Sequence, residues 1–87
     1  MYVHIGQDYM VSTRSIVSIF DMDTATNARS TRGLIARLEK EGRVVQVFDD
    51  LPKSAVLCMS ELGELLYITQ ISSTALQRRI ESGVTGL

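Results

Sequence analysis

The sequence has few of the residues that most often carry chemistry: in 87 residues there is no tryptophan, and there is one each of proline, cysteine and histidine. One cysteine cannot form an internal disulfide, so the simplest context is a reducing compartment, the cytoplasm. One histidine and one cysteine supply no metal cluster. No apolar run approaches the roughly 20 residues that span a bilayer, and no basic-then-apolar segment opens the chain. We therefore expect no membrane association, signal peptide or cofactor.

Charge is nearly balanced overall but unevenly spread. The formal net charge is −1 and the sequence pI is about 5.7, which gives no general attraction to nucleic acid. Residues 24–46, however, carry five Lys or Arg against two Glu, a local excess of three cations. Any nucleic-acid binding must therefore come from a local basic surface.

The length predicts a single domain over residues 1–87. Hydrophobic residues make up 45% of the chain. A chain this short buries only part of its apolar surface alone, so the composition favours self-association.

Apolar patterning predicts strands and helices in a definite order. Strands are expected at 2–5, 9–11, 15–21, 43–48, 54–60 and 64–69, with a short helical turn as the alternative for 15–21. Helices are expected at 27–41 and 71–83, capped by Asn27 and Ser73 and ended by Gly42 and Gly83. Short links between successive strands favour antiparallel pairing. The fold class is therefore α+β: a small, largely antiparallel sheet with two helices and a frayed chain end.

The segment "DDLPKS" at 49–54 has the composition of a stiff turn. Pro52 fixes its own φ and pushes Leu51 toward extended conformations. Asp49 and Asp50 favour turns through hydrogen bonds to nearby backbone. We therefore predict a hairpin between the flanking strands. Lys53 is not explained by the turn alone.

Two apolar runs that end in aspartates raise an enzymatic alternative. "SIVSIFDMDT" and "VVQVFDD" resemble the acid motifs of haloacid-dehalogenase-type phosphatases, with Asp21 as the nucleophile. That fold needs several parallel strands with helical crossovers, each about 30 residues long. One helix and hairpin links do not provide them, so we predict that the protein is not an enzyme. Cys58 is interpreted as inert packing and His4 as a hydrogen-bonded sheet residue, and the methionines at 10, 22 and 59 as core filler.

Three stretches together resemble the RemA/RemB-like family, most closely its RemB branch. They are "YVHIGQDYMVSTRSIVSIFD", "EGRVVQV" with "DDLPKS", and "LYITQISSTALQRR". The resemblance covers residues 2 to about 80, nearly the whole chain. It implies a small bacterial α+β subunit that assembles into a closed ring. It also implies a DNA-binding transcriptional regulator of extracellular-matrix and biofilm genes.

The resemblance also suggests which residues contact DNA. In the RemA branch, arginines in two places grip the phosphate backbone, and these places correspond here to "STRS" and "DDLPKS". This sequence offers Arg14, displaced by one position, and Lys53. A one-residue displacement on a strand would turn Arg14 to the other face. The secondary candidates are the helical cations Arg29, Arg32, Arg78 and Arg79.

Two functions remain open on the sequence. The first is a ring-forming homo-oligomer that binds double-stranded DNA through a repeated basic surface. The second is an oligomeric scaffold that binds another protein, or pairs with a paralogue, without touching DNA. The acidic pI and the missing loop arginines favour the second.

Overall fold

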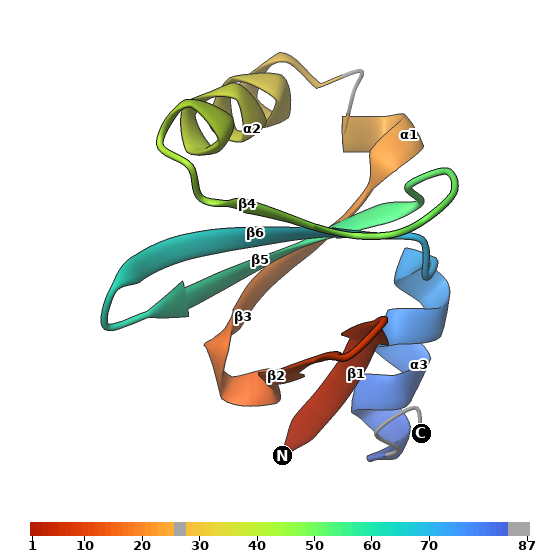
Figure 1. Cartoon of the computed structure of the whole chain (residues 1–87). Helices are drawn as coiled ribbons and strands as arrows, with labels where there is room; N and C mark the ends of the chain where they lie inside the picture. The colour runs from red at the N-terminus through yellow and green to blue at the C-terminus, as the bar shows by residue number, and fades with distance from the viewer. Residues whose placement is uncertain (26–27, 84–87) are drawn as a thin grey trace.

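The computed structural model describes residues 1–25 and 28–83, which form an α+β arrangement of two sheets and short helices (Figure 1). The elements follow the chain as β1 (Tyr2–Gly6), β2 (Tyr9–Ser12), the 3-10 turn η1 (Thr13–Ser15), β3 (Ile16–Asp21), α1 (Met22–Ala25), α2 (Arg29–Lys40), β4 (Val44–Val47), β5 (Ser54–Ser60), β6 (Gly63–Thr69) and α3 (Ser73–Ser82). The six predicted strands and both predicted helices are present. The sequence does not predict α1. The predicted cap at Asn27 and the predicted fraying of residues 84–87 lie outside the described residues.

The larger sheet has the strand order β3-β5-β6-β4, and the smaller one consists of β1 and β2. The β1–β2, β3–β5 and β5–β6 pairs are antiparallel, whereas β4 pairs in parallel with β6. The prediction of a largely antiparallel sheet is therefore confirmed, with β4 as the exception. The link between β5 and β6 is a hairpin, since Ser60 pairs with Gly63 across it, which agrees with the antiparallel pairing expected from short links.

The "DDLPKS" segment is a crossover, so the predicted hairpin between its flanking strands is wrong. β4 and β5 are not neighbours, because β6 lies between them. Two strand spacings amount to about 10 Å, a gap that six extended residues bridge easily. The Lys53 N–H donates to the Thr69 carbonyl at 2.8 Å, and the Met22 N–H donates to the Lys53 carbonyl at 3.0 Å. The end of the segment is thus fixed to both β6 and β3.

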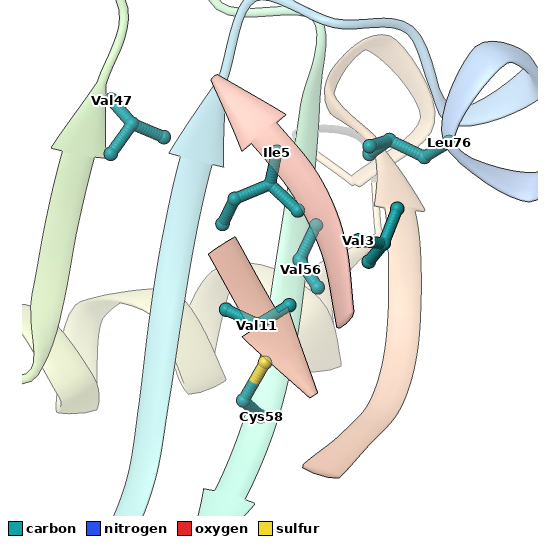
Figure 2. Packing of buried hydrophobic residues seen from close by; sticks show 7 residues of the cluster. All are labelled: Val3, Ile5, Val11, Val47, Val56, Cys58 and Leu76. Carbon is teal, nitrogen blue, oxygen red and sulfur yellow. The ribbon is translucent and has the colours of Figure 1, made fainter. Parts of the chain in front are cut away.

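Each face of the four-stranded sheet carries its own core, and the two faces are covered differently (Figure 1). One face is covered by the β1–β2 hairpin and α3; we call its buried cluster the hairpin-side core, consisting of Val3, Ile5, Val11, Val47, Val56, Cys58 and Leu76. Figure 2 shows this cluster, with side chains of the hairpin lying over the sheet. The other face is covered by α2; we call its cluster the helix-side core, consisting of Leu38, Ala55, Leu57, Leu66 and Ile68.

Successive side chains of β5 point alternately into the two cores. Val56 and Cys58 belong to the hairpin-side core, and Ala55 and Leu57 to the helix-side core. Successive strand side chains point to opposite faces, so a strand with a layer on each side is apolar at nearly every position. This explains why residues 54–58 are all buried while the strand shows no polar alternation there.

Polar contacts also join the hairpin to the sheet. The Thr69 hydroxyl donates to the Ile5 carbonyl at 2.5 Å, and the Ile71 N–H donates to the same hydroxyl at 3.1 Å. Gly6 has φ +136°, and a Cβ there would lie 2.9 Å from the Val47 carbonyl oxygen. Glycine at position 6 therefore allows the hairpin to approach β4 closely.

The helix ends follow capping chemistry, with one shift in position. Gly83 has φ 74° and ends α3, and Gly42 has φ 72° just beyond α2, as predicted. The predicted N-cap at Ser73 is wrong by one residue. The Ser72 hydroxyl accepts the Ala75 N–H at 3.1 Å, so Ser72 is the cap and Ser73 opens the helix. Among the described residues, no helix has the length and apolar character needed to span a membrane.

Candidate nucleic-acid interface

Arg14 lies in the η1 turn that leads into β3, and its side chain is exposed. The turn is closed by Ser12, whose hydroxyl accepts the Arg14 N–H at 3.3 Å and whose carbonyl accepts the Ser15 hydroxyl at 2.7 Å. Because Arg14 and Ser15 belong to a 3-10 turn, the expected reversal of face by a one-residue displacement on a strand does not apply here. Arg14 is therefore a solvent-facing cation on a fixed turn.

The surface beside Arg14 is apolar and hollowed. Ser12 and Ser15 line a cavity of about 210 Å³ together with Met10, Met59 and Tyr67. Met10 is 41% exposed and Met59 is 48% exposed, so the prediction that they fill the core is wrong. Met22 does pack against the helix-side core.

Two titratable groups near this hollow, Cys58 and Tyr67, are perturbed by burial. Burial raises the pKa of the Cys58 thiol, and a hydrogen bond with Ser15 acts in the opposite direction. Burial also raises the pKa of Tyr67, with smaller contributions from Cys58 and Tyr9. A raised pKa keeps the Cys58 thiol protonated and unreactive, which agrees with its interpretation as packing.

Lys53 lies at the opposite end of β3 from Arg14, since Asp21 at the end of β3 pairs with Ser54. Six strand residues separate the two cations by about 20 Å within one chain. Lys53 is exposed, but Asp21 and Asp23 line the same cavity of about 320 Å³. Asp49 and Asp50 precede Lys53 in the crossover. The local surface at Lys53 is therefore acidic, which opposes a polyanion.

The crossover is also fastened to the hairpin. The Gln7 amide donates to Asp49 Oδ1 at 3.0 Å, and the Asp49 N–H donates to Gln70 Oε1 at 3.0 Å. These contacts hold the first part of the crossover while Lys53 is fixed at its other end. The loop that carries Lys53 is thus held at both ends by hydrogen bonds.

Arg29 and Arg32 are exposed residues in the first turns of α2, on the outer side of the molecule. Leu38 anchors this helix, being fully buried in the helix-side core. A second anchor is ionic, because Arg37 contacts Glu64 at 3.0 Å and Glu41 at 3.4 Å. The Glu64 carboxylate raises the pKa of Arg37. Glu41 and Glu64 are therefore both paired with Arg37 near the carboxyl-terminal end of α2.

Arg43 completes that ionic group. Its guanidinium lies 3.8 Å from Glu41 Oε1 and donates to the Glu64 carbonyl at 3.1 Å. Among the cations counted in residues 24–46, Arg37 and Arg43 thus pair with Glu41 and Glu64. Sequence spacing gives a hint of the Arg37–Glu41 pair, which is one helical turn apart, but not of Glu64.

The two cations of α3 differ. Arg78 is exposed on the helix surface. Arg79 is half-buried and donates to the His4 carbonyl at 2.9 Å, so it joins α3 to β1. The His4 ring itself is hydrogen-bonded through Nε2 to the Gln7 carbonyl, as predicted for a sheet residue. The structure therefore places Arg14, Lys53 and Arg78 in different parts of the surface. It keeps Arg29 and Arg32 together, one turn apart on α2, and gives Arg79 an internal partner.

In the described part of the chain, this is a small α+β protein with exposed cations on several elements, two sheet edges that pair on one side only and no cluster of metal-ligating side chains. No family model matches the chain. The chain is 32% identical over 81 residues to Extracellular matrix regulatory protein B of Bacillus subtilis (strain 168), which covers 93% of this chain and 91% of that protein. The chain therefore belongs to the RemB-like family of extracellular matrix regulatory proteins, as its sequence motifs indicate.

Proposed function

We propose that this protein regulates extracellular-matrix genes by binding double-stranded DNA as a homo-oligomer in the cytoplasm. The similarity to Extracellular matrix regulatory protein B carries the proposal, because it extends over 93% of the chain.

Assembly is supported by the edges of the larger sheet. Within the described chain, β3 and β4 each pair on one side only. Val17 on β3 is 60% exposed. Open edges pair readily with other chains, and closing a ring of copies removes them. We therefore infer a closed ring, in which the Arg14 side chains of successive copies repeat around one surface.

DNA binding by such a ring relies on repetition. Each subunit offers Arg14 and a few further cations on an otherwise acidic chain, so a single subunit would bind weakly. Joining several copies raises the effective concentration of every later contact. Binding through phosphates is weakly sequence-specific and falls with salt, with a slope of about 0.9 for each neutralised phosphate.

We also propose that the protein acts by binding and not by catalysis. The phosphatase alternative needs parallel strands around Asp21, whereas among the described strands β3 pairs only with β5, which is antiparallel to it. Asp21 and Asp23 do share a cavity with Lys53. If this cavity were catalytic, Asp21→Asn would abolish a measurable phosphatase activity of the purified protein; we expect no such activity to be found.

The test is a polarisation titration of A·T-rich duplex DNA at about 50 and 200 mM salt, with the assembly mass measured in parallel. We expect salt-dependent binding by the wild type. Arg14→Glu is expected to weaken it at least tenfold while the mass stays unchanged. Absence of wild-type binding at the lower salt concentration would refute DNA binding by the protein on its own.

A second function, a scaffold for another protein or a paralogue, is favoured by one observation. The four aspartates near Lys53 make that end of β3 unsuited to DNA and suited to a basic protein surface. Lys53→Glu distinguishes the two functions. Weaker DNA binding with an intact assembly contradicts the pure scaffold, and no DNA binding by any form supports it.

A further inference from the structure

The outward face of α2 has an unusual composition. With 3.6 residues per turn, the positions directly opposite the buried Leu38 are Arg29, Gly33, Ala36 and Lys40. All four are exposed. We call them the outer line of α2. A cation stands at each end, two small residues lie between them, and the cations are eleven positions apart in the sequence, about 16 Å along the axis.

Gly33 has no explanation within the subunit. It lies in the interior of α2, where glycine is less favourable than alanine. A Cβ added there would meet nothing within 4 Å, and its φ is not positive. The other described glycines (Gly6, Gly42, Gly63 and Gly83) all have positive φ. The small side chain at position 33 therefore suits something that approaches the helix from outside.

The charge of the outer line identifies the class of partner. It holds two cations and no carboxylate. Of the nearby carboxylates, Glu41 and Glu64 are engaged by Arg37 and Arg43. The exposed Glu39 lies on one flank of the line, one helical turn from Ala36. By contrast, the surface at Lys53 carries aspartates in the same cavity. Within the described chain, the outer line is thus a better match for a polyanion than the crossover that carries Lys53.

The dimensions agree with duplex DNA. A major groove about 12 Å wide admits an α-helix. Cations about 16 Å apart can reach phosphates on both sides of such a groove, because each side chain extends several ångströms beyond the axis. Small side chains between them let the backbone of the helix lie close to the base edges, and alanine can contact a thymine methyl group.

We propose that α2 enters the major groove of duplex DNA along its outer line, with Arg29 and Lys40 on phosphates and Gly33 and Ala36 against base edges. This rests on the proposed DNA binding and assigns it a second contact, separate from Arg14. The exposed small residues distinguish this arrangement from phosphate contact alone, since a purely electrostatic face would tolerate larger side chains at their positions.

The first test is steric. Ala36→Leu keeps charge and helix propensity but adds bulk to the outer line. We expect it to weaken binding to an A·T-rich duplex at least tenfold without changing the salt dependence. The matched control is Gln77→Leu, an exposed and uncharged position on α3. It is expected to bind as the wild type does. Thermal unfolding and solution mass confirm that both variants fold and assemble.

The second test is electrostatic. Lys40→Gln is expected to lower the slope of log affinity against log salt by about one for each subunit in contact with DNA. Lys53→Gln removes the same charge from the acidic cavity and is expected to change the slope less. Equal or reversed effects contradict the assignment.

A third test reports position directly. An iron chelate attached through Ala36→Cys should cleave bound DNA in a narrow window, and one attached through Gln77→Cys should not. Wild-type protein controls for the native Cys58, which is 6% exposed.

The outcomes separate the two proposals. If wild-type protein binds no duplex, the proposed function and this inference both fail. If it binds, but Ala36→Leu binds equally well and Ala36→Cys gives no cleavage, only the role of α2 is refuted. If Ala36→Leu changes the solution mass and leaves DNA affinity intact, the outer line contacts protein and the inference is wrong.

Discussion

The two faces of the four-stranded sheet are joined to their covering layers by different kinds of polar contact. On the hairpin side, Thr69 and Arg79 bond to β1, so their polar atoms hold layers together. On the helix side, Arg37 of α2 pairs with Glu64 of β6 and with Glu41, so these ionic contacts lie beside the carboxyl-terminal end of α2. Arg79 makes its structural contact while half-buried, and Arg37 makes its contact while exposed. Neither residue type nor exposure alone therefore tells which cations hold layers together.

The largest effect is expected from removing the central leucine of each layer. Leu38→Ala and Leu76→Ala each leave a cavity in a fully buried site and should lower the free energy of unfolding by about 2–5 kcal/mol. Because the sheet separates the two sites, the double variant should lose the sum of the two within about 0.5 kcal/mol. Urea unfolding at fixed protein concentration measures this. A large departure from additivity would mean that the two cores behave as one.

Thr69→Val tests the polar attachment of the hairpin side. The substitution removes the hydroxyl that serves Ile5 and Ile71 and leaves a buried carbonyl unsatisfied, which should cost about 1–3 kcal/mol. Thr74→Val on the exposed surface of α3 is the matched control and should stay within about 0.5 kcal/mol of the wild type. Equal effects of the two substitutions would show that the Thr69 contacts contribute nothing to stability.

Gly33→Ala tests whether the outer line of α2 serves the subunit itself. The position has open space and helical backbone, so alanine should raise the free energy of unfolding by about 1 kcal/mol. Gly42→Ala, at φ 72°, should have the opposite sign. Thermal unfolding of the two variants gives the comparison. Destabilisation by Gly33→Ala would reveal a requirement for glycine within the fold.

Alkaline pH should destabilise the hairpin-side core first. Near neutral pH, this effect on the free energy of unfolding is expected to be the smallest of those considered. Burial raises the pKa of Cys58 and Tyr67 above their ordinary values of 9.0 and 10.0, and both belong to or pack against that core. The unfolded chain therefore loses these protons at lower pH than the folded chain. Stability should be constant below about pH 8 and fall as pH rises through these values. Cys58→Ala should flatten the first part of that decline in unfolding titrations; an unchanged profile would assign the decline to other groups.

The sequence indicates most of the elements but not how they pair. Alternating and continuous apolar runs predict β5 and β6, and Gly42 and Gly83 end α2 and α3 as expected. The crossover through Pro52 has the composition of a hairpin turn, yet β6 occupies the place beside β5 that a hairpin would give to β4. Local turn chemistry is the same for both connections, so no local signal distinguishes them. The N-cap shift from Ser73 to Ser72 is similar, since adjacent serines offer equal hydroxyls.

In the candidate site, too, the sequence indicates the cations but not their neighbours. Arg14, Arg29, Arg32 and Lys53 can be identified as cations in suggestive positions from the sequence and its family resemblance. That Asp21 and Asp23 share a cavity with Lys53 depends on the pairing of β3 with β5, across more than 30 residues of chain. The internal partner of Arg79 requires the hairpin to lie under α3, 75 residues away.

The sequence by itself determined the apolar strands, the helix ends and the family of this protein, because those depend on side-chain order over short stretches. Only the tertiary structure decided which strands are neighbours, which cations are already bonded and which face of α2 is exposed. Those outcomes follow from contacts between distant segments, whose free energies depend on mutual burial and cannot be assigned to any stretch alone.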